Sequence, residues 1–306
     1  MDISVIISTW NNCERLSITL NDLFRCFIPA NLRWELVLVN NNCTDDTDRV
    51  AHDFAKKLPL VYIREPIQGI SRARNSGLRK ASGVLVIFID DDMRPCSELI
   101  ETYWSAYKEK PSGYFFGGPV FSEFEGVSPS KELLNLAPWS IKGLNLGSLE
   151  RALDPNECFI SNWSVSRSFL NETSGFDVKK GLNARKGRSL IGEETALMEC
   201  LKIKGLIPWY LPSAKVFHYV PIAKGCLQHI STRWEAGGYE MASRYNKDFD
   251  GIRFMGVPRW MYKKAFFFWL KCIFERFRGK TEYRDYRLYR QMVGMINWYR
   301  DAAKFP

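Results

Sequence analysis

Residues 84–92 read Val84-Leu85-Val86-Ile87-Phe88-Ile89-Asp90-Asp91-Asp92, an apolar run that ends in three adjacent carboxylates. A short run without polar alternation is typical of a strand that a parallel sheet buries on both faces. On an open α/β sheet, the carboxyl ends of such strands line the ligand crevice. Three adjacent carboxylates repel unless a cation holds them, and such oxygen ligands favour Mg²⁺ or Mn²⁺, which bridge phosphate oxygens. Taken alone, the stretch is equally compatible with an acidic turn before Pro95.

Strand and helix patterns alternate on the N-terminal side of this run. Apolar runs predict strands at residues 4–8, 35–39, 60–64 and 84–89, and helical spacing predicts helices at 13–26, 45–57 and 71–81. Continuous apolar strands that alternate with helices predict an α/β fold with a parallel sheet covered on both faces.

The pattern changes after Pro95. We predict helices through Trp104 and at 193–204, strands at 114–116, 159–166, 207–211 and 215–219, and helical structure from 225 onward. The segment 123–156 contains Gly, Ser and Pro and is predicted to be a long irregular surface excursion, which is more often functional than idle.

Two further motifs follow strands of the predicted sheet. In the stretch 68–77, Gly69, an N-capping serine and two arginines open a helix and could seat a diphosphate. In the stretch 8–12, Trp10 lies among small polar residues and could stack on a nucleobase. Alone, each is compatible with a basic surface helix or a packed aromatic ring. Since both motifs and the acidic run follow strands of one sheet, their convergence favours a functional site.

The ordered set of motifs resembles the family 2 glycosyltransferases, which have the nucleotide-sugar-binding GT-A fold. The resemblance covers about residues 1–220. It rests on stretches 5–11, 35–45, 69–77, 88–92, 117–119, 162–167, 175–177, 192–197 and 212–218.

The resemblance implies a set of donor-binding residues: Ser8, Thr9, Trp10, Asn12, Asn40, Gly69, Arg74, Asp91, Gly118 and Asn162. Ser8, Thr9 and Trp10 would hold the base and ribose, and Arg74 would approach the base or the diphosphate. Asn40 replaces the aspartate by which the family usually reads uracil, and Cys43 replaces a nearby serine as a small packing residue. A UDP-sugar is the favoured donor, because an Asn amide can accept from N3–H and donate to O4 of uracil.

The resemblance also implies a divalent metal, Mn²⁺ or Mg²⁺. Asp90 and Asp92 match the D-x-D carboxylates, with Asp92 as the more direct ligand and Asp91 as a ribose partner. His218 matches a position that supplies a further ligand in some relatives; a strand-end histidine without a role is the alternative.

Inverting members of the family use a carboxylate from a Glu-Asp pair at a helix start. Here the pair is Glu193-Glu194, and Glu194 is the predicted general base, with Glu193 second. Two acids in the first turn of a helix are also common without catalysis. The implied mechanism is a single displacement by the acceptor hydroxyl. Gly117 and Gly118 would let the backbone approach the donor sugar, whose pocket Asn162 and Trp163 would shape.

Composition and charge define the rest of the chain. The 306 residues carry a net charge of +9 and eight cysteines without a C-x-x-C pair, which indicates reduced thiols and no zinc motif. Most of the excess charge lies in residues 253–290.

We predict a GT-A domain at 1–222, with a nucleotide-binding half at 1–95 and an acceptor half at 96–222. A basic, aromatic-rich helical region follows at 223–306.

In and directly after the segment 260–277, large apolar residues alternate with basic ones: Phe266, Phe267, Trp269, Leu270, Ile273, Phe274 and Phe277 lie among Lys263, Lys264, Lys271, Arg276 and Arg278. Such a helix can lie on an anionic membrane face, which would suit a lipid-linked saccharide acceptor in surface polysaccharide assembly. Packing on the catalytic domain or on a second copy in a homo-oligomer is the alternative. With neither a leader nor a membrane-spanning run in view, we expect a cytoplasmic protein, or one peripheral at the inner face of the membrane.

Three competing functions are considered. A sugar nucleotidyltransferase shares a related sheet, but residues 8–13 contain no glycine for its signature loop. A nucleotide-sugar-binding pseudoenzyme is suggested by Asn40 and Glu194, whereas the intact Asp90–Asp92 run argues against it. Nucleic-acid binding is suggested only by the charge of the tail, which no recognition motif accompanies.

Overall fold

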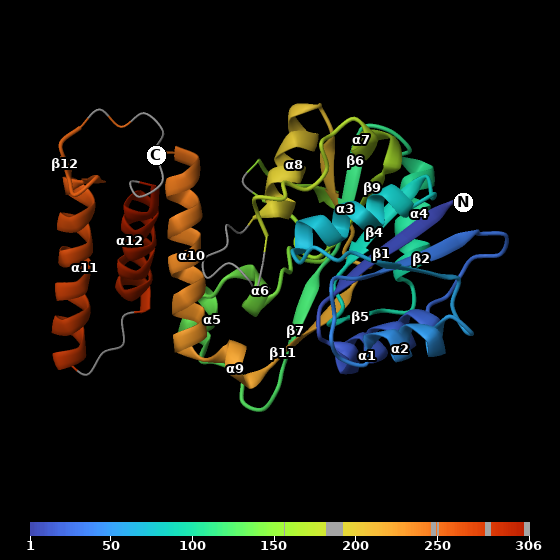
Figure 1. The fold of residues 1–306 in the computed structure, drawn as a ribbon, viewed down its shortest axis with the longest axis horizontal. Helices are drawn as coiled ribbons and strands as arrows, with labels where there is room; N and C mark the ends of the chain where they lie inside the picture. Colours follow the sequence, from blue (N-terminus) through green and yellow to red (C-terminus); the bar gives the residue numbers. More distant parts are fainter. Residues whose placement is uncertain (156, 182–191, 246–248, 250, 279–282, 303–306) are drawn as a thin grey trace. The chain divides into compact units, whose positions relative to one another are not determined.

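The computed structural model describes residues 1–155, 157–181, 192–245, 249, 251–278 and 283–302. The chain divides into two compact units (Figure 1). Unit 1 comprises the described residues of Met1–Glu123, Gly143–Gly187 and Gly192–Tyr219, and unit 2 those of Phe124–Lys142 and Val220–Pro306. Within the described residues, none of the helices combines the length and the apolar character that crossing a bilayer requires.

Unit 1 is built on an eight-stranded sheet of order β3-β2-β1-β4-β9-β6-β10-β8. Its strands are β1 (Ile3–Thr9), β2 (Trp34–Asn40), β3 (Leu60–Arg64), β4 (Leu85–Ile89), β6 (Tyr114–Gly117), β8 (Arg151–Ala152), β9 (Asn162–Ser166) and β10 (Ile207–Tyr210). The first four strands are parallel, as predicted, whereas β9 runs antiparallel to both β4 and β6. The sheet is therefore mixed.

Helices follow the predicted strands closely. They are α1 (Cys13–Phe24), α2 (Thr47–Phe54), α3 (Ile70–Lys80), α4 (Leu99–Glu109), α7 (Arg167–Asn171) and α8 (Glu193–Ile203). Except for the short α7, each was predicted, because apolar residues recur at helical spacing and each helix buries that stripe. In α1, for example, Leu16, Leu20 and Leu23 are buried while Phe24 is half exposed.

A second, three-stranded sheet of order β5-β11-β7 was not predicted in full. It comprises β5 (Met93–Pro95), β7 (Val120–Phe124) and β11 (Val216–Val220), of which only β11 was expected. β5 pairs antiparallel with β11 and sets His218 opposite Met93. This pairing brings the histidine next to the acidic run, although the two are more than a hundred residues apart in the chain.

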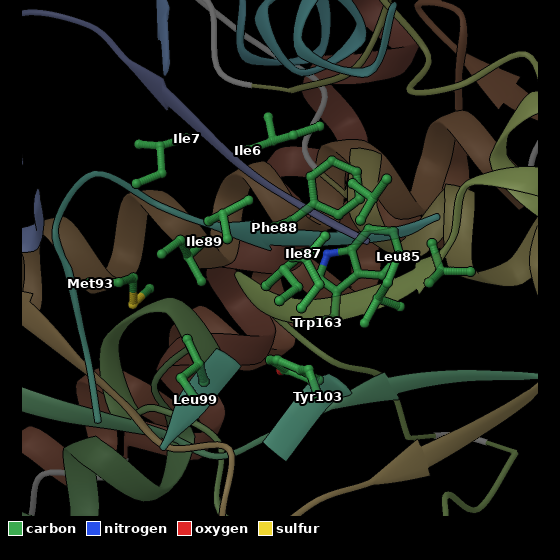
Figure 2. Close-up of a cluster of buried hydrophobic side chains, with 14 of the residues drawn as sticks. Ile6, Ile7, Leu85, Ile87, Phe88, Ile89, Met93, Leu99, Tyr103 and Trp163 are labelled. Atoms are coloured by element: carbon green, nitrogen blue, oxygen red, sulfur yellow. The ribbon is translucent and has the colours of Figure 1, made fainter. Parts of the chain in front are cut away.

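Aromatic packing fills the space beneath the ends of β4 and β9 (Figure 2). The rings of Phe88 and Trp163 stack with centroids 4.6 Å apart, and Phe176 meets Phe88 edge-on at 5.3 Å. All three side chains are almost fully buried. Such packing holds β4, which precedes the carboxylates, against its sheet neighbour β9, because aromatic pairs stabilise a contact beyond the burial of their apolar area.

The expectation of an irregular excursion at 123–156 was wrong in part. The segment contains α5 (Lys131–Leu136) and α6 (Trp139–Lys142). The Oγ of Ser130 accepts the N–H of Leu133 at 3.4 Å and caps α5, and Trp234 Nε1 donates to the Leu136 carbonyl at 2.9 Å. These helices are too short to show periodicity in the sequence, and their stabilisation comes from long-range packing in unit 2.

Unit 2 contains the C-terminal helices α9 (Ile222–Gly225), α10 (Leu227–Tyr245), α11 (Arg259–Phe277) and α12 (Tyr283–Ala302), with a hairpin of β12 (Arg253–Phe254) and β13 (Val257–Pro258). α12 packs against both α10 and α11 (Figure 1). Two glycines let α10 and α12 approach. A Cβ on Gly238 would lie 2.0 Å from the Gln291 carbonyl oxygen, and one on Gly294 would lie 1.9 Å from that of Glu235.

Replacing Gly294 by alanine is therefore expected to destabilise unit 2. The added methyl group would collide with the backbone of the facing helix, and overpacking of this kind costs about 1–3 kcal/mol. Gly237 is the matched control, since it lies on α10 with no atom within 4 Å of its Cβ position. Gly237→Ala should raise stability by up to about 1 kcal/mol through helix propensity. Urea unfolding of both variants checks this; equal effects would contradict the close approach of α10 and α12.

Candidate active site

The polar residues singled out in the sequence gather in unit 1 where β1, β2 and β4 end. Residues 8–12 follow β1, Asn40 closes β2, and residues 90–92 follow β4. Helices α3 and α8 contribute Arg74 and the Glu193–Glu194 pair. The side-chain contacts described below connect α3 and α8 to the acidic run.

Arg74 is the centre of the charged cluster. Its side chain is only 4% exposed, and its guanidinium lies 2.8 Å from Asp90 Oδ1, 2.9 Å from Glu193 Oε1 and 3.4 Å from Glu194 Oε1. Burial acts to lower the pKa of Arg74, but the three carboxylates outweigh it and raise that pKa, so the charge is permanent. The prediction that Arg74 approaches the base or diphosphate is not supported by these contacts. Its planar fork is occupied by carboxylates, which it holds together.

Glu194 is held in place from three sides. Its Oε1 accepts from Trp163 Nε1 at 3.0 Å and also faces Arg74, while its Oε2 accepts the backbone N–H of Ser161 at 3.2 Å. Burial raises the pKa of Glu194 to about 7. Arg74 opposes that rise, and the charges of Asp90 and Glu193 add to it. A carboxylate with a pKa near neutrality, held in a fixed orientation, has the properties of a general base.

Asp92 and His218 form the second pair of potential ligands. His218 Nε2 lies 3.3 Å from Asp92 Oδ2, and the Tyr219 N–H donates to the Asp92 carbonyl at 3.1 Å. Burial and the neighbouring Asp92 raise the pKa of Asp91 to about 7, against the hydrogen bonds of Thr9 and Asn12. A bound cation would reverse this shift, because it favours the ionised carboxylates.

The residues present fit a divalent cation with few protein ligands. Asp90 binds Arg74 through one oxygen, and no group of three or more acidic, His or Cys side chains in the described residues is arranged to hold a metal. Asp92 and His218 remain as a converging carboxylate and imidazole. Mg²⁺ and related ions are commonly held by one or two carboxylates together with substrate phosphates, so a two-ligand site is consistent with that chemistry.

Trp10 is the exposed aromatic ring at the end of β1. Its side chain is 45% exposed, whereas Thr9 beside it is 2% exposed. Ser8 Oγ is buried without a hydrogen-bond partner among the described residues, which leaves it able to bind a ligand group. An exposed ring with a hydroxyl nearby is available for stacking, and the binding of a nucleotide by these residues stays a prediction.

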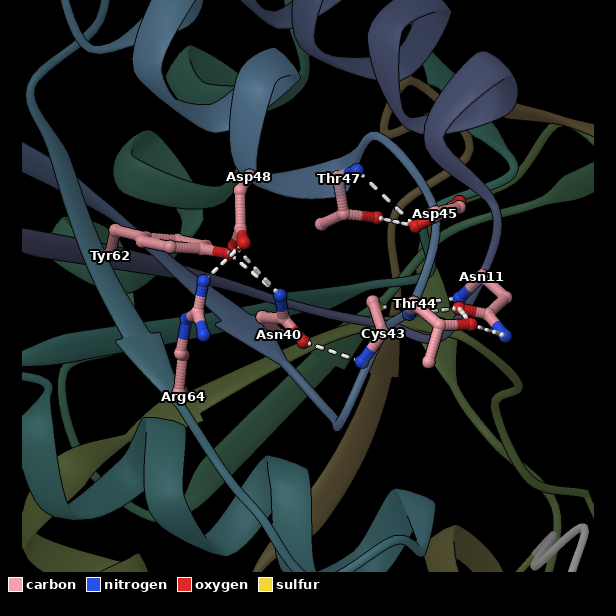
Figure 3. Close-up of polar contacts among 9 residues, drawn as sticks. All are labelled: Asn11, Asn40, Cys43, Thr44, Asp45, Thr47, Asp48, Tyr62 and Arg64. Atoms are coloured by element: carbon pink, nitrogen blue, oxygen red, sulfur yellow. Dashed lines mark hydrogen bonds and ion pairs between the residues drawn. The ribbon is translucent and has the colours of Figure 1, made fainter.

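Asn40 is 3% exposed and lies in a polar network rather than open to a ligand (Figure 3). Its Nδ2 donates to Tyr62 Oη at 2.7 Å and to Asp48 Oδ1 at 3.1 Å, and its Oδ1 accepts the Cys43 N–H at 2.7 Å. Asp48 also accepts from Tyr62 and from Arg64. Both donors of the Asn40 amide are therefore occupied. A base could reach it only through the second lone pair of Oδ1.

Asp48 and Tyr62 were not singled out in the sequence. They come from α2 and β3, and neither belongs to a motif that signals a site. Trp163 and the Ser161 N–H, which position Glu194, were also missed as partners of the base. No sequence signal could have found them, because the left-handed backbone of Ser161, with φ of 50°, is visible only in the structure.

Asn162 and Gly118 are both held in packing contacts within unit 1. Asn162 is fully buried, donates to the carbonyls of Pro119 and Ala214, and accepts from Tyr103 Oη at 2.8 Å. A Cβ on Gly118 would lie 1.9 Å from the Ala214 carbonyl oxygen. Both residues take part in the packing between β9, β6 and the chain before β11, and their contact with the donor sugar stays a prediction.

Gly69 and Gly117 are likewise explained by the fold. Gly69 precedes α3 with φ of 144°, and its N–H donates to Asn41 Oδ1 at 2.8 Å, so this donor is not free for a diphosphate. A Cβ on Gly117 would lie 2.2 Å from the ring of Phe159. Glycine is therefore required at these two positions by the backbone conformation and the close packing, and the groups able to bind a ligand are the neighbouring side chains.

The sequence of the chain is similar to those of known proteins. The model of the family described as Glycosyl transferase family 2 matches residues 4–173, more than half of the chain. The chain is 30% identical over 101 residues to the glycosyltransferase AglE of Haloferax volcanii, covering 32% of this chain and 33% of AglE. It is 23% identical over 264 residues to the probable glycosyltransferase YdaM of Bacillus subtilis, covering 81% of this chain and 57% of YdaM. The chain thus spans between a third and about three fifths of these two relatives.

Solved structures show the same fold. Residues 1–349 of Staphylococcus aureus TarS in complex with UDP align with a TM-score of 0.57 at 15% identity, covering 99% of this chain and 90% of that chain. The mannosyltransferase PcManGT of Pyrobaculum calidifontis, in complex with GDP-Man and Mn²⁺, aligns with a TM-score of 0.58 at 16% identity, covering 99% and 87%. The predicted GT-A fold with additional C-terminal helices is confirmed.

Proposed function

The chain belongs to glycosyltransferase family 2, and from this premise we propose that it is an inverting, metal-dependent enzyme. It transfers a hexosyl or N-acetylhexosaminyl group from a nucleoside diphosphate sugar to a hydroxyl of a saccharide or lipid-linked saccharide. The observation that carries the proposal is the position of Glu194. Its carboxylate has a pKa raised to about 7 and is held by Trp163, Ser161 and Arg74.

The nucleotide would bind where β1 and β2 end. Trp10 supplies an exposed ring for stacking, and Ser8 and Asn12 supply polar groups beside it. A UDP-sugar is the favoured donor, and the TarS complexes with UDP and UDP-GlcNAc support it. PcManGT is a GDP-Man complex, and both amide donors of Asn40 are bonded within the protein. The test below therefore includes donors with other nucleobases.

Asp92 and His218 would hold the divalent ion, with Asp90 as a further carboxylate if Arg74 releases it. When bound, the ion supplies positive charge against the diphosphate of the donor. Asp91 lies beside Thr9 and Asn12, which suits a partner for the ribose hydroxyls. The activity assay that identifies the donor also compares Mn²⁺ with Mg²⁺.

The reaction is a single displacement. Glu194 accepts the proton of the acceptor hydroxyl as its oxygen attacks C1 of the sugar. The new bond from C1 to this oxygen forms as the bond from C1 to the phosphate oxygen breaks, and the electron pair leaves with the nucleoside diphosphate. Attack from the opposite face inverts C1, so an α-linked donor yields a β-glycoside. Arg74 keeps Glu193 and Glu194 oriented and balances their charge.

The acceptor is proposed to be a cell-surface polymer or its lipid-linked precursor. The relatives include the minor teichoic acid biosynthesis protein GgaB of Bacillus subtilis and the poly(ribitol-phosphate) β-N-acetylglucosaminyltransferase TarS, although the chain spans only 10% and 25% of their lengths. This setting favours an enzyme at the cytoplasmic face of the membrane. A catalytic region at 1–222 followed by a helical region is also proposed, and the start of the last segment of unit 2 at Val220 supports it.

The test measures release of nucleoside diphosphate from UDP-, GDP- and dTDP-sugars with Mn²⁺ or Mg²⁺. We expect turnover of one donor, lost with a chelator and reduced about 10³-fold in Asp92→Asn, since an interaction made at the leaving group is removed. Asp53→Asn, exposed on α2, is the matched control and should retain activity. Donor binding without turnover in the wild type would favour the pseudoenzyme, and formation of a nucleotide sugar from a sugar phosphate would favour the nucleotidyltransferase.

A further inference from the structure

Helix α11 carries a large apolar face that unit 2 leaves exposed. Met261 and Ala265 on its inner face are buried in the cluster it shares with α12. On the opposite side the exposed fractions of the residues are 59% for Phe266, 44% for Leu270 and 54% for Phe274. At 100° per residue these three and Phe277 share one outward stripe, so the aromatics that define the segment in the sequence are not core residues of this unit.

The hairpin before α11 continues this face. Phe254 meets Tyr262 edge-on with ring centroids 5.9 Å apart, and the Arg259 N–H donates to the Ile252 carbonyl at 3.0 Å. Ile252 and Met255 are 72% and 73% exposed. Large apolar side chains exposed in this number on one helix and its adjoining hairpin indicate an interaction site.

Basic side chains surround the apolar stripe and lie along its rings. Lys271 Nζ is 4.9 Å from the ring centroid of Phe267, and the Arg278 guanidinium is 4.3 Å from that of Phe274. Lys263 and Lys264 are also exposed, and Glu275 is the only acidic residue of the helix. Lysine and arginine side chains have an apolar chain and a cationic end. Beside an aromatic surface they are suited to the interface of a membrane, where the hydrocarbon core meets anionic headgroups.

We propose that this face, formed by α11 and the β12–β13 hairpin, docks on the surface of an anionic phospholipid bilayer. The aromatic rings would enter the headgroup and acyl boundary, and the lysines and arginines would meet lipid phosphates. A second copy of the chain fits less well, because pairing this face with itself would bring two basic surfaces together. The proposal concerns unit 2 only and does not depend on the chemistry of the active site.

The experiment is sedimentation of the full chain with vesicles of phosphatidylcholine alone or with about a third phosphatidylglycerol. We expect binding to the anionic vesicles at least about tenfold tighter than to the neutral ones, and weaker in high salt. Phe266→Ser/Phe274→Ser should weaken it roughly a hundredfold, at about tenfold for each buried ring. Lys263→Gln/Lys264→Gln should weaken it roughly 25-fold, at about fivefold for each charge.

Matched controls replace exposed residues of other segments. Val127→Ser/Ile203→Ser changes two apolar side chains that are 89% and 87% exposed, and Lys56→Gln/Lys57→Gln changes two lysines beside α2. Both should bind like the wild type. All variants should retain their circular dichroism spectrum, and turnover of donor with a soluble acceptor should be unchanged.

Two results would overturn the proposal. The first is absence of vesicle binding, or equal binding to neutral and anionic vesicles. The second is a dimer in analytical ultracentrifugation that Phe266→Ser/Phe274→Ser dissociates while no vesicles are bound, which would assign the face to a second copy. Vesicle binding by a chain that turns over no donor would reject the proposed enzymatic function and leave the docking surface standing.

Discussion

Glu194→Gln is expected to lower kcat about 10³-fold with little change in donor affinity. Glutamine keeps the shape of the side chain, and its one oxygen can still accept from Trp163 Nε1, whereas the bond from the Ser161 N–H is lost. What is lost is the ability to take a proton from the acceptor. Nucleoside diphosphate release and binding of the intact donor, measured separately, distinguish a chemical defect from a binding defect.

The pH profile provides a second readout of the same assignment. Burial raises the pKa of Glu194 to about 7, so the base is increasingly protonated below that pH. We expect kcat of the wild type to fall as pH decreases through about 7, and this acidic limb to disappear from the residual activity of Glu194→Gln. Glu199→Gln, exposed on the same helix, should retain both rate and profile. A profile shared by the wild type and Glu194→Gln, or a larger loss in Glu193→Gln, would move the base to Glu193.

Arg74→Ala is expected to destabilise the protein by about 3–5 kcal/mol, because removal of one member of a buried ionic cluster leaves the others uncompensated. Its guanidinium contacts Asp90, Glu193 and Glu194 and is 4% exposed. Denaturant unfolding measures the loss. Arg79→Ala is the matched control, since this arginine lies five residues later on α3 with 70% exposure and should cost no more than about 1 kcal/mol.

The deficit of Arg74→Ala should depend on pH in a definite direction. Burial already raises the pKa of Glu194 and Arg74 opposes that rise, so without the guanidinium the ionisation of Glu194 opposes folding more strongly as pH rises. The loss of stability should therefore be smaller at pH 5 than at pH 8. Arg74→Lys keeps the charge but not the fork, and we expect it to recover only part of the stability. A deficit that is independent of pH would indicate lost packing rather than lost charge.

The architecture of unit 1 followed from short-range patterns. Apolar runs of strand length and leucines at helical spacing predicted β1 to β4 and α1 to α4, and the structure has each of them within a few residues. The predictions failed where an element depends on distant partners. β5 has three residues and forms because β11 pairs with it, and α5 is stabilised by Trp234 from a helix a hundred residues later.

The candidate site divides in the same way. The acidic run and Trp10 were identified from residue type, motif and spacing, and Glu194 from the resemblance to the family; the structure has them in unit 1 at strand ends or a helix start. The donor-binding roles predicted for Asn162 and Gly118 stay predictions, because a polar side chain or a glycine next to a motif can serve packing equally well. Nothing local in the sequence distinguishes an amide that bonds to Tyr103 from one that bonds to a sugar.

The sequence by itself determined the α/β class, the family and the residues able to carry the chemistry, because periodicity and motif order are local properties of the chain. Only the tertiary structure decided which of them act together. In the structure, Arg74 is the counter-charge of three carboxylates. The Asn40 amide donates to Tyr62 and Asp48. The aromatic stripe of α11 is exposed. These outcomes depend on burial and on partners distant in the chain, which fix both the charge state and the availability of a side chain.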